Sequence, residues 1–64
     1  MNWSTYIVHL HSKPSPAWTY YQGTVLVVAA DPEYAKERAV GKLKRTTFPD
    51  RPLDGWVVDR VELA

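Results

Sequence analysis

The chain has 64 residues, which predicts a single domain with a thin core, because a domain of this size buries only about 60% of the surface of its unfolded chain. Its composition, 45% hydrophobic and 23% charged, excludes the low-hydrophobicity, high-charge pattern of disordered chains. The lack of cysteine excludes a disulfide framework, a zinc ribbon and a thiol nucleophile. We expect a soluble, cytoplasmic protein, because no apolar run approaches the ~20 residues that cross a bilayer and no signal-peptide pattern is present.

The first expected strand covers residues 3–12, which are rich in β-branched and aromatic types. Alternation places Tyr6, Val8 and Leu10 on one face, and further apolar residues on the other face favour a central strand. His9 and His11 share that second face and would need a third ligand to hold a metal. No third ligand completes the set, so a polar pair is the simpler interpretation, and we expect no metal or other cofactor.

Residues 13–16 read Lys-Pro-Ser-Pro, which predicts an exposed loop because proline lacks the amide donor that a sheet requires. The run from residue 18 to residue 30 divides at Gly23 into an aromatic half and an aliphatic half, and the aliphatic half predicts a second strand. Gly23 indicates either a bulge or a bend. Residues 18–22 either extend the strand or form a flap, and the pattern leaves the pairing register open.

A helix is expected to begin at about Asp31. Aspartate caps the first amide groups, Pro32 at the first helical position loses no needed donor, and Glu33 complements the helix dipole. The stripe expected to face the sheet, with Val40 at its margin, consists of Ala35, Ala39, Leu43 and Thr46. After the helix ends near residues 46–49, the side chains expected to reach back over the core are Phe48 and Leu53.

The last strand is expected over residues 56–63, where apolar residues fall on both alternating faces. We expect the inward face to carry Val57, Asp59, Val61 and Leu63. The order strand, strand, helix, strand then predicts one α+β domain over residues 1–64. Its three-stranded antiparallel sheet would carry one helix on one face, in a split β-α-β (ββαβ) arrangement with strand order 2-1-3. The other sheet face is left for loops or a partner.

Six of the eight positive charges cluster in the helix and the loop after it: Lys36, Arg38, Lys42, Lys44, Arg45 and Arg51. On a helical wheel, one flank gathers Tyr34, Arg38, Lys42 and Arg45. This flank suits phosphates or an acidic protein surface, whereas a solvated face that complements the helix dipole is the simpler alternative. Two glutamates in the same helix and a net charge of +1 favour a protein surface over nucleic acid.

Three aromatic residues, Trp18, Tyr20 and Tyr21, follow the proline loop. Amphipathic rings in such a place serve either as contact anchors or as a lid over the uncovered sheet face. Catalytic patterns are weak by comparison. The serines lack a nucleophile-elbow context, the isolated glycines form no phosphate-binding loop, and so small a chain has little volume for a pocket. We therefore expect a protein that is not an enzyme.

Residues 25–39, Val-Leu-Val-Val-Ala-Ala-Asp-Pro-Glu-Tyr-Ala-Lys-Glu-Arg-Ala, resemble the strand-to-helix junction of many very small α+β proteins. In size and element order the chain also resembles small phage-encoded accessory proteins, including some anti-CRISPR proteins. This resemblance implies a non-enzymatic inhibitor that docks on a larger host complex, sometimes in a nucleic-acid channel. It assigns a role to no individual residue.

The sequence thus predicts a binding protein that docks on a larger protein or nucleoprotein complex and inhibits or modulates it, without membrane contact. The candidate contacts are Tyr34, Arg38, Lys42, Arg45, Trp18, Tyr20 and Tyr21. One alternative is a nucleic-acid-binding module that uses the basic helix flank. Another is a homodimer or larger oligomer that pairs edge strands or uncovered sheet faces.

Overall fold

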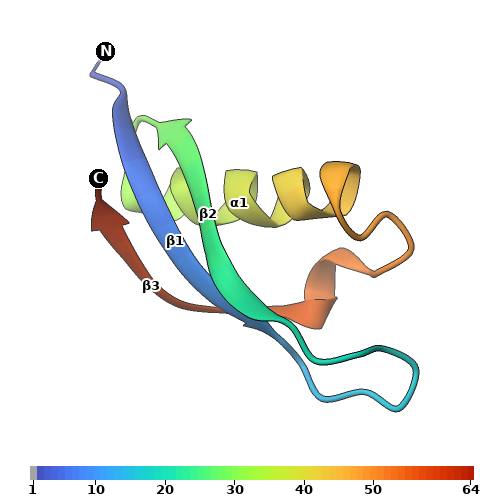
Figure 1. The fold of residues 1–64 in the computed structure, drawn as a ribbon. Helices are drawn as coiled ribbons and strands as arrows, with labels where there is room; N and C mark the ends of the chain where they lie inside the picture. The colour runs from blue at the N-terminus through green and yellow to red at the C-terminus, as the bar shows by residue number, and fades with distance from the viewer. Residues whose placement is uncertain (1) are drawn as a thin grey trace.

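The computed structural model describes residues 2–64 and confirms the α+β fold (Figure 1). The elements are β1 (Ser4–Ser12), β2 (Gln22–Ala29), α1 (Pro32–Thr46), a short 3-10 turn η1 (Leu53–Gly55) and β3 (Trp56–Leu63). The central strand β1 runs antiparallel to both neighbours, so the sheet has the order β2-β1-β3. The single helix α1 packs on one face of this sheet and leaves the opposite face uncovered by any helix of residues 2–64.

The core lies between α1 and the inward face of the sheet. Strands β1 and β2 supply alternate buried residues, as their period-2 patterns require: Tyr6, Val8, Leu10, Val25, Val27 and Ala29. The helix contributes Ala35, Ala39 and Leu43, and both alanines are fully buried, which lets the helix backbone lie close to the strands. Thr46, expected at the end of this stripe, is instead exposed, and its hydroxyl donates to the carbonyl of Lys42 at 2.7 Å.

The boundaries of α1 follow from local chemistry. The Asp31 carboxylate accepts a hydrogen bond from the backbone amide of Tyr34 at 2.8 Å, which confirms the predicted N-cap. At the other end, the amides of Thr47 and Phe48 both donate to the carbonyl of Leu43, at 3.0 and 2.8 Å. These bonds close the last turn and direct the chain into the loop that precedes β3.

The end of the core is closed by Phe48 and, contrary to expectation, by Arg51. The ring of Phe48 lies 5.4 Å from that of Trp56, so Phe48 does reach back over the core. Leu53, expected to do the same, is 57% exposed, because it lies in the turn η1 at the edge of the molecule. The Arg51 guanidinium takes that inward place, 4.3 Å from the Phe48 ring and 5.3 Å from the Trp56 ring.

The inward face of β3 differs from the expectation, and a β-bulge is the reason. Leu10 pairs with Val58 and His9 pairs with Arg60, so Asp59 is an extra residue without a partner in β1. One extra residue reverses the alternation that follows it. The residues opposite the inward positions of β1 are therefore Trp56, Val58, Val61 and Leu63. The expected inward positions of Val57 and Asp59 were wrong; both are exposed.

Gly23 is the second residue of β2 and, of the two predicted alternatives, marks no bulge. It pairs with Leu10 in a β1–β2 register that is continuous from His11 and Gln22 to Ser4 and Ala29. A methyl group at Gly23 would lie only 2.7 Å from the hydroxyl oxygen of Tyr21 and 3.0 Å from its ring carbon Cζ. The glycine therefore leaves room for the Tyr21 ring, which packs on the core beside Phe48 and Trp56.

We expect Gly23→Ala to lower the free energy of unfolding by about 1–2 kcal/mol, because the new methyl group forces the Tyr21 ring off its neighbours. Urea unfolding followed by tryptophan fluorescence measures the loss. Tyr21→Phe removes the atom that the methyl group meets first, so the double variant should be more stable than the sum of the two single changes predicts, by at least about 0.5 kcal/mol. Strict additivity would contradict this account of Gly23.

Candidate functional site

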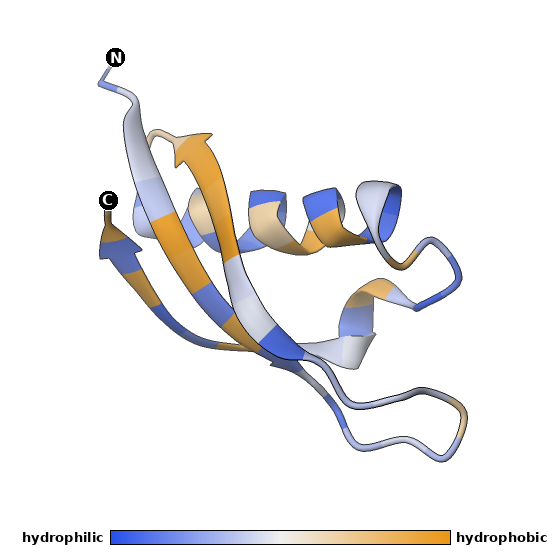
Figure 2. Cartoon of the chain, viewed as in Figure 1, coloured by the Kyte–Doolittle hydropathy of each residue, from blue (hydrophilic) through white to orange (hydrophobic). Residues whose placement is uncertain are grey.

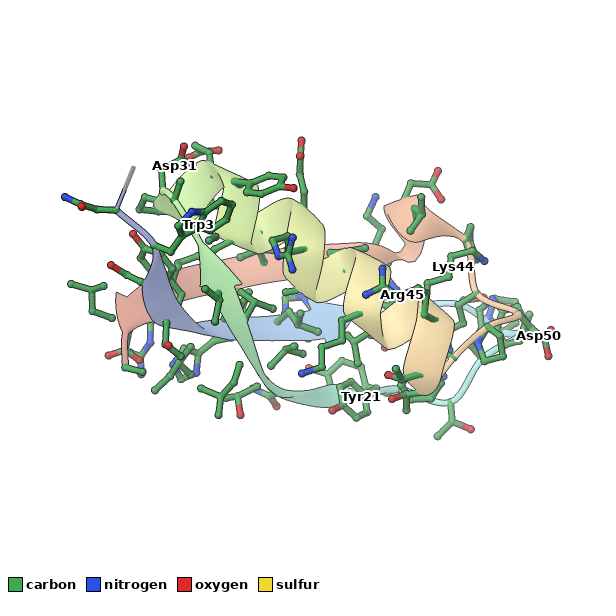
Figure 3. All side chains as sticks on the ribbon, turned by 90° about the horizontal axis from the view of Figure 1, so that it is seen from above. Trp3, Tyr21, Asp31, Lys44, Arg45 and Asp50 are labelled. Atoms are coloured by element: carbon green, nitrogen blue, oxygen red, sulfur yellow. The ribbon has the colours of Figure 1, made fainter. Side chains whose placement is uncertain are left out.

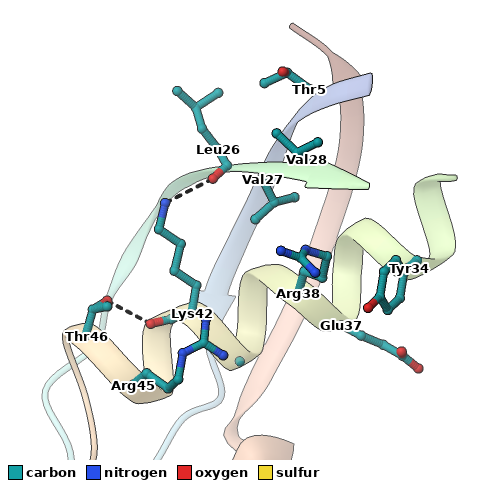
Figure 4. A pocket seen from close by; sticks show the side chains of 11 residues that line it. Thr5, Leu26, Val27, Val28, Tyr34, Glu37, Arg38, Lys42, Arg45 and Thr46 are labelled. Atoms are coloured by element: carbon teal, nitrogen blue, oxygen red, sulfur yellow. Dashed lines mark hydrogen bonds between the residues drawn. The ribbon is translucent and has the colours of Figure 1, made fainter. Parts of the chain in front are cut away.

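An open groove lies between α1 and the outer edge of β2, with a volume of about 660 Å³. Figure 4 shows this groove with the helix on one side and β2 on the other. All four residues of the predicted helix flank line it: Tyr34, Arg38, Lys42 and Arg45. The β2 side contributes Leu26, Val27 and Val28. We call this feature the cationic groove.

Helical spacing places the flank there. Tyr34, Arg38 and Lys42 each lie one residue before a buried position of α1, namely Ala35, Ala39 and Leu43. A residue next to the buried stripe lies at the border where the helix meets the sheet. Because α1 packs chiefly against β2, this border runs beside the edge strand β2.

Lys42 spans the groove and bonds to the edge of the sheet. Its Nζ donates to the backbone carbonyl of Leu26 at 3.1 Å, a bond drawn in Figure 4. β2 has a strand neighbour on one side only within residues 2–64, so this carbonyl belongs to the outer edge. A lysine over an edge strand is a common protection against unwanted strand pairing. The ammonium thus satisfies one carbonyl of an otherwise unpaired edge.

An aromatic and cationic contact closes one end of the groove. The Tyr34 ring lies 6.4 Å from the ring of Trp3, and the Arg38 guanidinium lies 5.5 Å from the centre of the Tyr34 ring. Tyr34 is exposed on α1, and Trp3 precedes β1. These contacts hold the Arg38 side chain along the helix while its charge stays in water.

The groove carries an uncompensated positive charge. The ion pairs among residues 2–64 join His9 to Glu62, His11 to Asp59, Lys36 to Glu33 and Arg60 to Glu62, so none of them includes a cation of the groove. Its one acidic lining residue is Glu37, and Figure 4 shows this side chain directed away from β2. Three cations therefore face one side of the groove with a single carboxylate nearby.

The other cations of the predicted cluster lie elsewhere and have structural contacts. Lys44 donates to the backbone carbonyls of Pro49 and Arg51, at 2.9 and 2.8 Å, and so fastens the loop after α1 (Figure 3). Arg51 is buried at the end of the core, with 6% of its surface exposed. Lys36 lies on the helix beside Glu33, at 3.2 Å. Only half of the sequence cluster thus contributes to the groove.

The three aromatic residues predicted as contacts, Trp18, Tyr20 and Tyr21, do not line the groove, and they do not form one surface. Trp18 lies over the Arg51 guanidinium at 5.6 Å. Tyr20 is 60% exposed, and its ring lies 6.2 Å from that of His11, at the uncovered face of the sheet. Tyr21 packs against the core, with its ring 5.1 Å from that of Phe48. Tyr20 is therefore the most accessible of the three for an external contact.

The uncovered sheet face carries apolar side chains that sequence reasoning did not single out. Leu26 and Val28 of β2 are 56% and 49% exposed, and Figure 2 shows the apolar stretch of this strand. On the same face, Nε2 of His9 contacts the Glu62 carboxylate, and Nδ1 of His11 lies 2.9 Å from a carboxylate oxygen of Asp59. Residues 25–28 are all aliphatic, so their alternation between core and surface left no pattern in the sequence.

Residues 2–64 contain no cluster of three histidine, aspartate or glutamate side chains placed to hold a metal ion. Over the same residues, α1 is neither long enough nor apolar enough to cross a membrane. No protein-family model matches the chain, and neither a curated protein nor a solved structure is significantly similar to it. The groove and the sheet edge beside it are therefore the features that bear on function.

Proposed function

We propose that this protein is a non-enzymatic binding protein that docks on a larger protein or nucleoprotein complex through the cationic groove. The observation that carries the proposal is the convergence of Arg38, Lys42 and Arg45 on one open hollow without an ion-pair partner among residues 2–64. Unpaired cations beside an exposed apolar strand are features of protein interaction surfaces. Inhibition or modulation of the partner rests on the resemblance of the chain, in size and element order, to small phage-encoded accessory proteins.

The composition of the groove supports binding rather than catalysis. Its titratable side chains are three cations, Tyr34 and a glutamate directed away from β2. Acid and base catalysis needs two positioned groups that exchange a proton near neutral pH, and nucleophilic catalysis needs an activated hydroxyl, thiol or amine. Arginine and lysine side chains in an open groove instead suit recognition of anionic groups.

The experiment is capture of partners by the tagged protein from a lysate of the cells that encode it, with identification by mass spectrometry. We expect Arg38→Glu/Lys42→Glu/Arg45→Glu to reduce capture by at least about tenfold, because three attractive contacts become repulsive. The matched control is Lys13→Glu/Lys36→Glu/Arg60→Glu, which changes the net charge equally at positions that do not line the groove. Circular dichroism checks the fold of both variants.

Equal capture by the two triple variants would refute docking through the groove. Loss of capture after nuclease treatment, with direct binding to a labelled oligonucleotide that weakens steeply as salt is added, would instead indicate the nucleic-acid alternative. Light scattering at several concentrations tests the homodimer alternative, since a strict monomer excludes it.

A further inference from the structure

The outer edge of β2 offers backbone groups for a fourth strand. In an antiparallel pair, both backbone groups of alternate residues point toward the partner strand, and those of the intervening residues point away. The Leu26 carbonyl accepts its bond from Lys42 of α1, so Leu26 belongs to the outward set. The same set contains the residues two positions before and after it, Thr24 and Val28. The outer edge is paired with no strand of residues 2–64.

The two sides of this edge differ in chemistry. A strand added along β2 would place alternate side chains on the two faces of the sheet. Those on the helix side would enter the cationic groove, beside Arg38, Lys42 and Arg45. Those on the other side would lie on the uncovered face, beside the exposed side chains of Leu26 and Val28. The surface therefore matches a segment in which acidic and apolar residues alternate.

The spacing of the cations agrees with this pattern. Arg38 and Lys42 are four residues apart on α1, which corresponds to a rise of about 6 Å. Side chains on one face of a strand repeat every two residues, or about 6.7 Å. Acidic side chains at every second position of an added strand can thus meet successive cations of the helix.

We propose that the partner docks by adding an extended acidic segment as a fourth strand on the edge of β2, with its acidic side chains in the cationic groove and its apolar side chains on the uncovered face. This inference rests on the proposed function and names the kind of partner. On binding, Lys42 exchanges the Leu26 carbonyl for a carboxylate of the segment, and the carbonyl accepts a backbone amide of the added strand. Lys42 thereby covers the edge of β2 when no segment is bound, and it pairs with a carboxylate of the segment when one is bound.

A second copy of this chain fits the edge less well. Two β2 edges paired by a twofold axis perpendicular to the sheet would place both helices on the same face. The two sets of Arg38, Lys42 and Arg45 would then face each other along the new pair, and like charges at an interface oppose association. Charge complementarity therefore favours an acidic segment of a different protein.

The test uses a fluorescent eight-residue peptide of alternating glutamate and valine and two derivatives. One derivative carries N-methyl groups on all glutamate amides, and the other carries them on all valine amides. In an added strand only one of these two sets points toward β2, so one derivative should bind at least about tenfold more weakly and the other should keep most of the affinity. Fluorescence anisotropy measures binding. Amide exchange by NMR should slow at Leu26 and Val28 when the unmodified peptide binds.

Two protein variants test whether the peptide binds in the cationic groove. We expect Arg38→Glu to weaken peptide binding by about tenfold, because an attractive contact becomes repulsive. The matched control Lys36→Glu changes the same charge on the same helix outside the groove and should leave the affinity within about twofold. A peptide with four glutamates followed by four valines has the same composition without alternation, and it should bind at least about tenfold more weakly.

Equal binding of the two methylated peptides, or unchanged exchange at Leu26 and Val28, would overturn strand addition. If capture of the cellular partner still depends on the three cations in that case, the proposed function stands and only this mode of docking is wrong. An eight-residue thymidine oligonucleotide that binds more tightly than the peptide and displaces it would overturn the acidic protein segment as the partner.

Discussion

Ala39→Glu is expected to leave the protein largely unfolded at room temperature. Ala39 is fully buried where α1 meets the sheet, with 0% of its surface exposed. A glutamate there overfills the contact, at a cost of about 1–3 kcal/mol, and buries an unpaired charge, at a cost of several more. A chain of 64 residues has a free energy of unfolding of about 3–10 kcal/mol. The two costs together are as large as this free energy.

Far-UV circular dichroism and urea unfolding measure this effect, and two variants separate its causes. Ala39→Leu adds volume without charge and should cost about 1–3 kcal/mol. Gly41→Glu introduces the same charged side chain two residues along the helix, where a new Cβ meets nothing closer than 3.6 Å. This control should be neutral or stabilising by up to about 1 kcal/mol, because glycine is a poor helix former. Cooperative unfolding of Ala39→Glu near the wild-type midpoint would contradict close packing of the helix on the sheet.

The topology could be predicted because its signals are local. Asp31, Pro32 and Glu33 begin a helix by chemistry that acts within one turn, and the predicted cap is present in the structure. The period-2 pattern of β1 and the right-handed crossover rule then leave few arrangements for two strands, a helix and a third strand. Each of these inferences depends only on neighbouring residues or on chain chirality.

The inward face of β3 could not be predicted by strict alternation, because a bulge depends on pairing with a distant strand. Trp56 and Val58 are two residues apart, and so are Val61 and Leu63, but the gap between the two pairs is odd. Such a gap between two alternating runs is the sequence signal of one extra residue, here Asp59. The same change of parity accounts for the mixed pattern of the whole strand.

Part of the candidate site could be predicted from the sequence, and part could not. The flank of α1 followed from helical geometry, and the structure places its four residues along one groove. The positions of the loop residues could not be predicted, because loop conformation depends on contacts with residues far along the chain. Arg51 belongs to the cluster of positive charges in the sequence, yet it packs under Trp18. Tyr21 is one of the predicted contact residues, yet it packs beside Phe48.

Arg51→Ala is expected to lower the free energy of unfolding by about 3 kcal/mol. The Arg51 guanidinium donates to the carbonyl of Thr19 at 2.6 Å and lies 4.3–5.6 Å from the rings of Phe48, Trp56 and Trp18. It therefore joins residues 18–19, the loop after α1 and the start of β3. A charged hydrogen bond contributes about 1.5–3 kcal/mol, and a desolvated cation above an aromatic ring contributes about 2 kcal/mol, while burial of the charge offsets part of both.

Arg51→Lys distinguishes the planar group from its charge. Lysine keeps the charge but cannot stack on the rings while it bonds to Thr19, so we expect a loss of about 2 kcal/mol. Urea unfolding followed by tryptophan fluorescence measures both variants. The matched control is Arg60→Ala, which removes an exposed arginine 3.3 Å from Glu62 and should cost no more than about 1 kcal/mol. If Arg51→Lys were as stable as the wild type, the charge alone would hold the three segments together, and stacking of the guanidinium would be excluded as the cause.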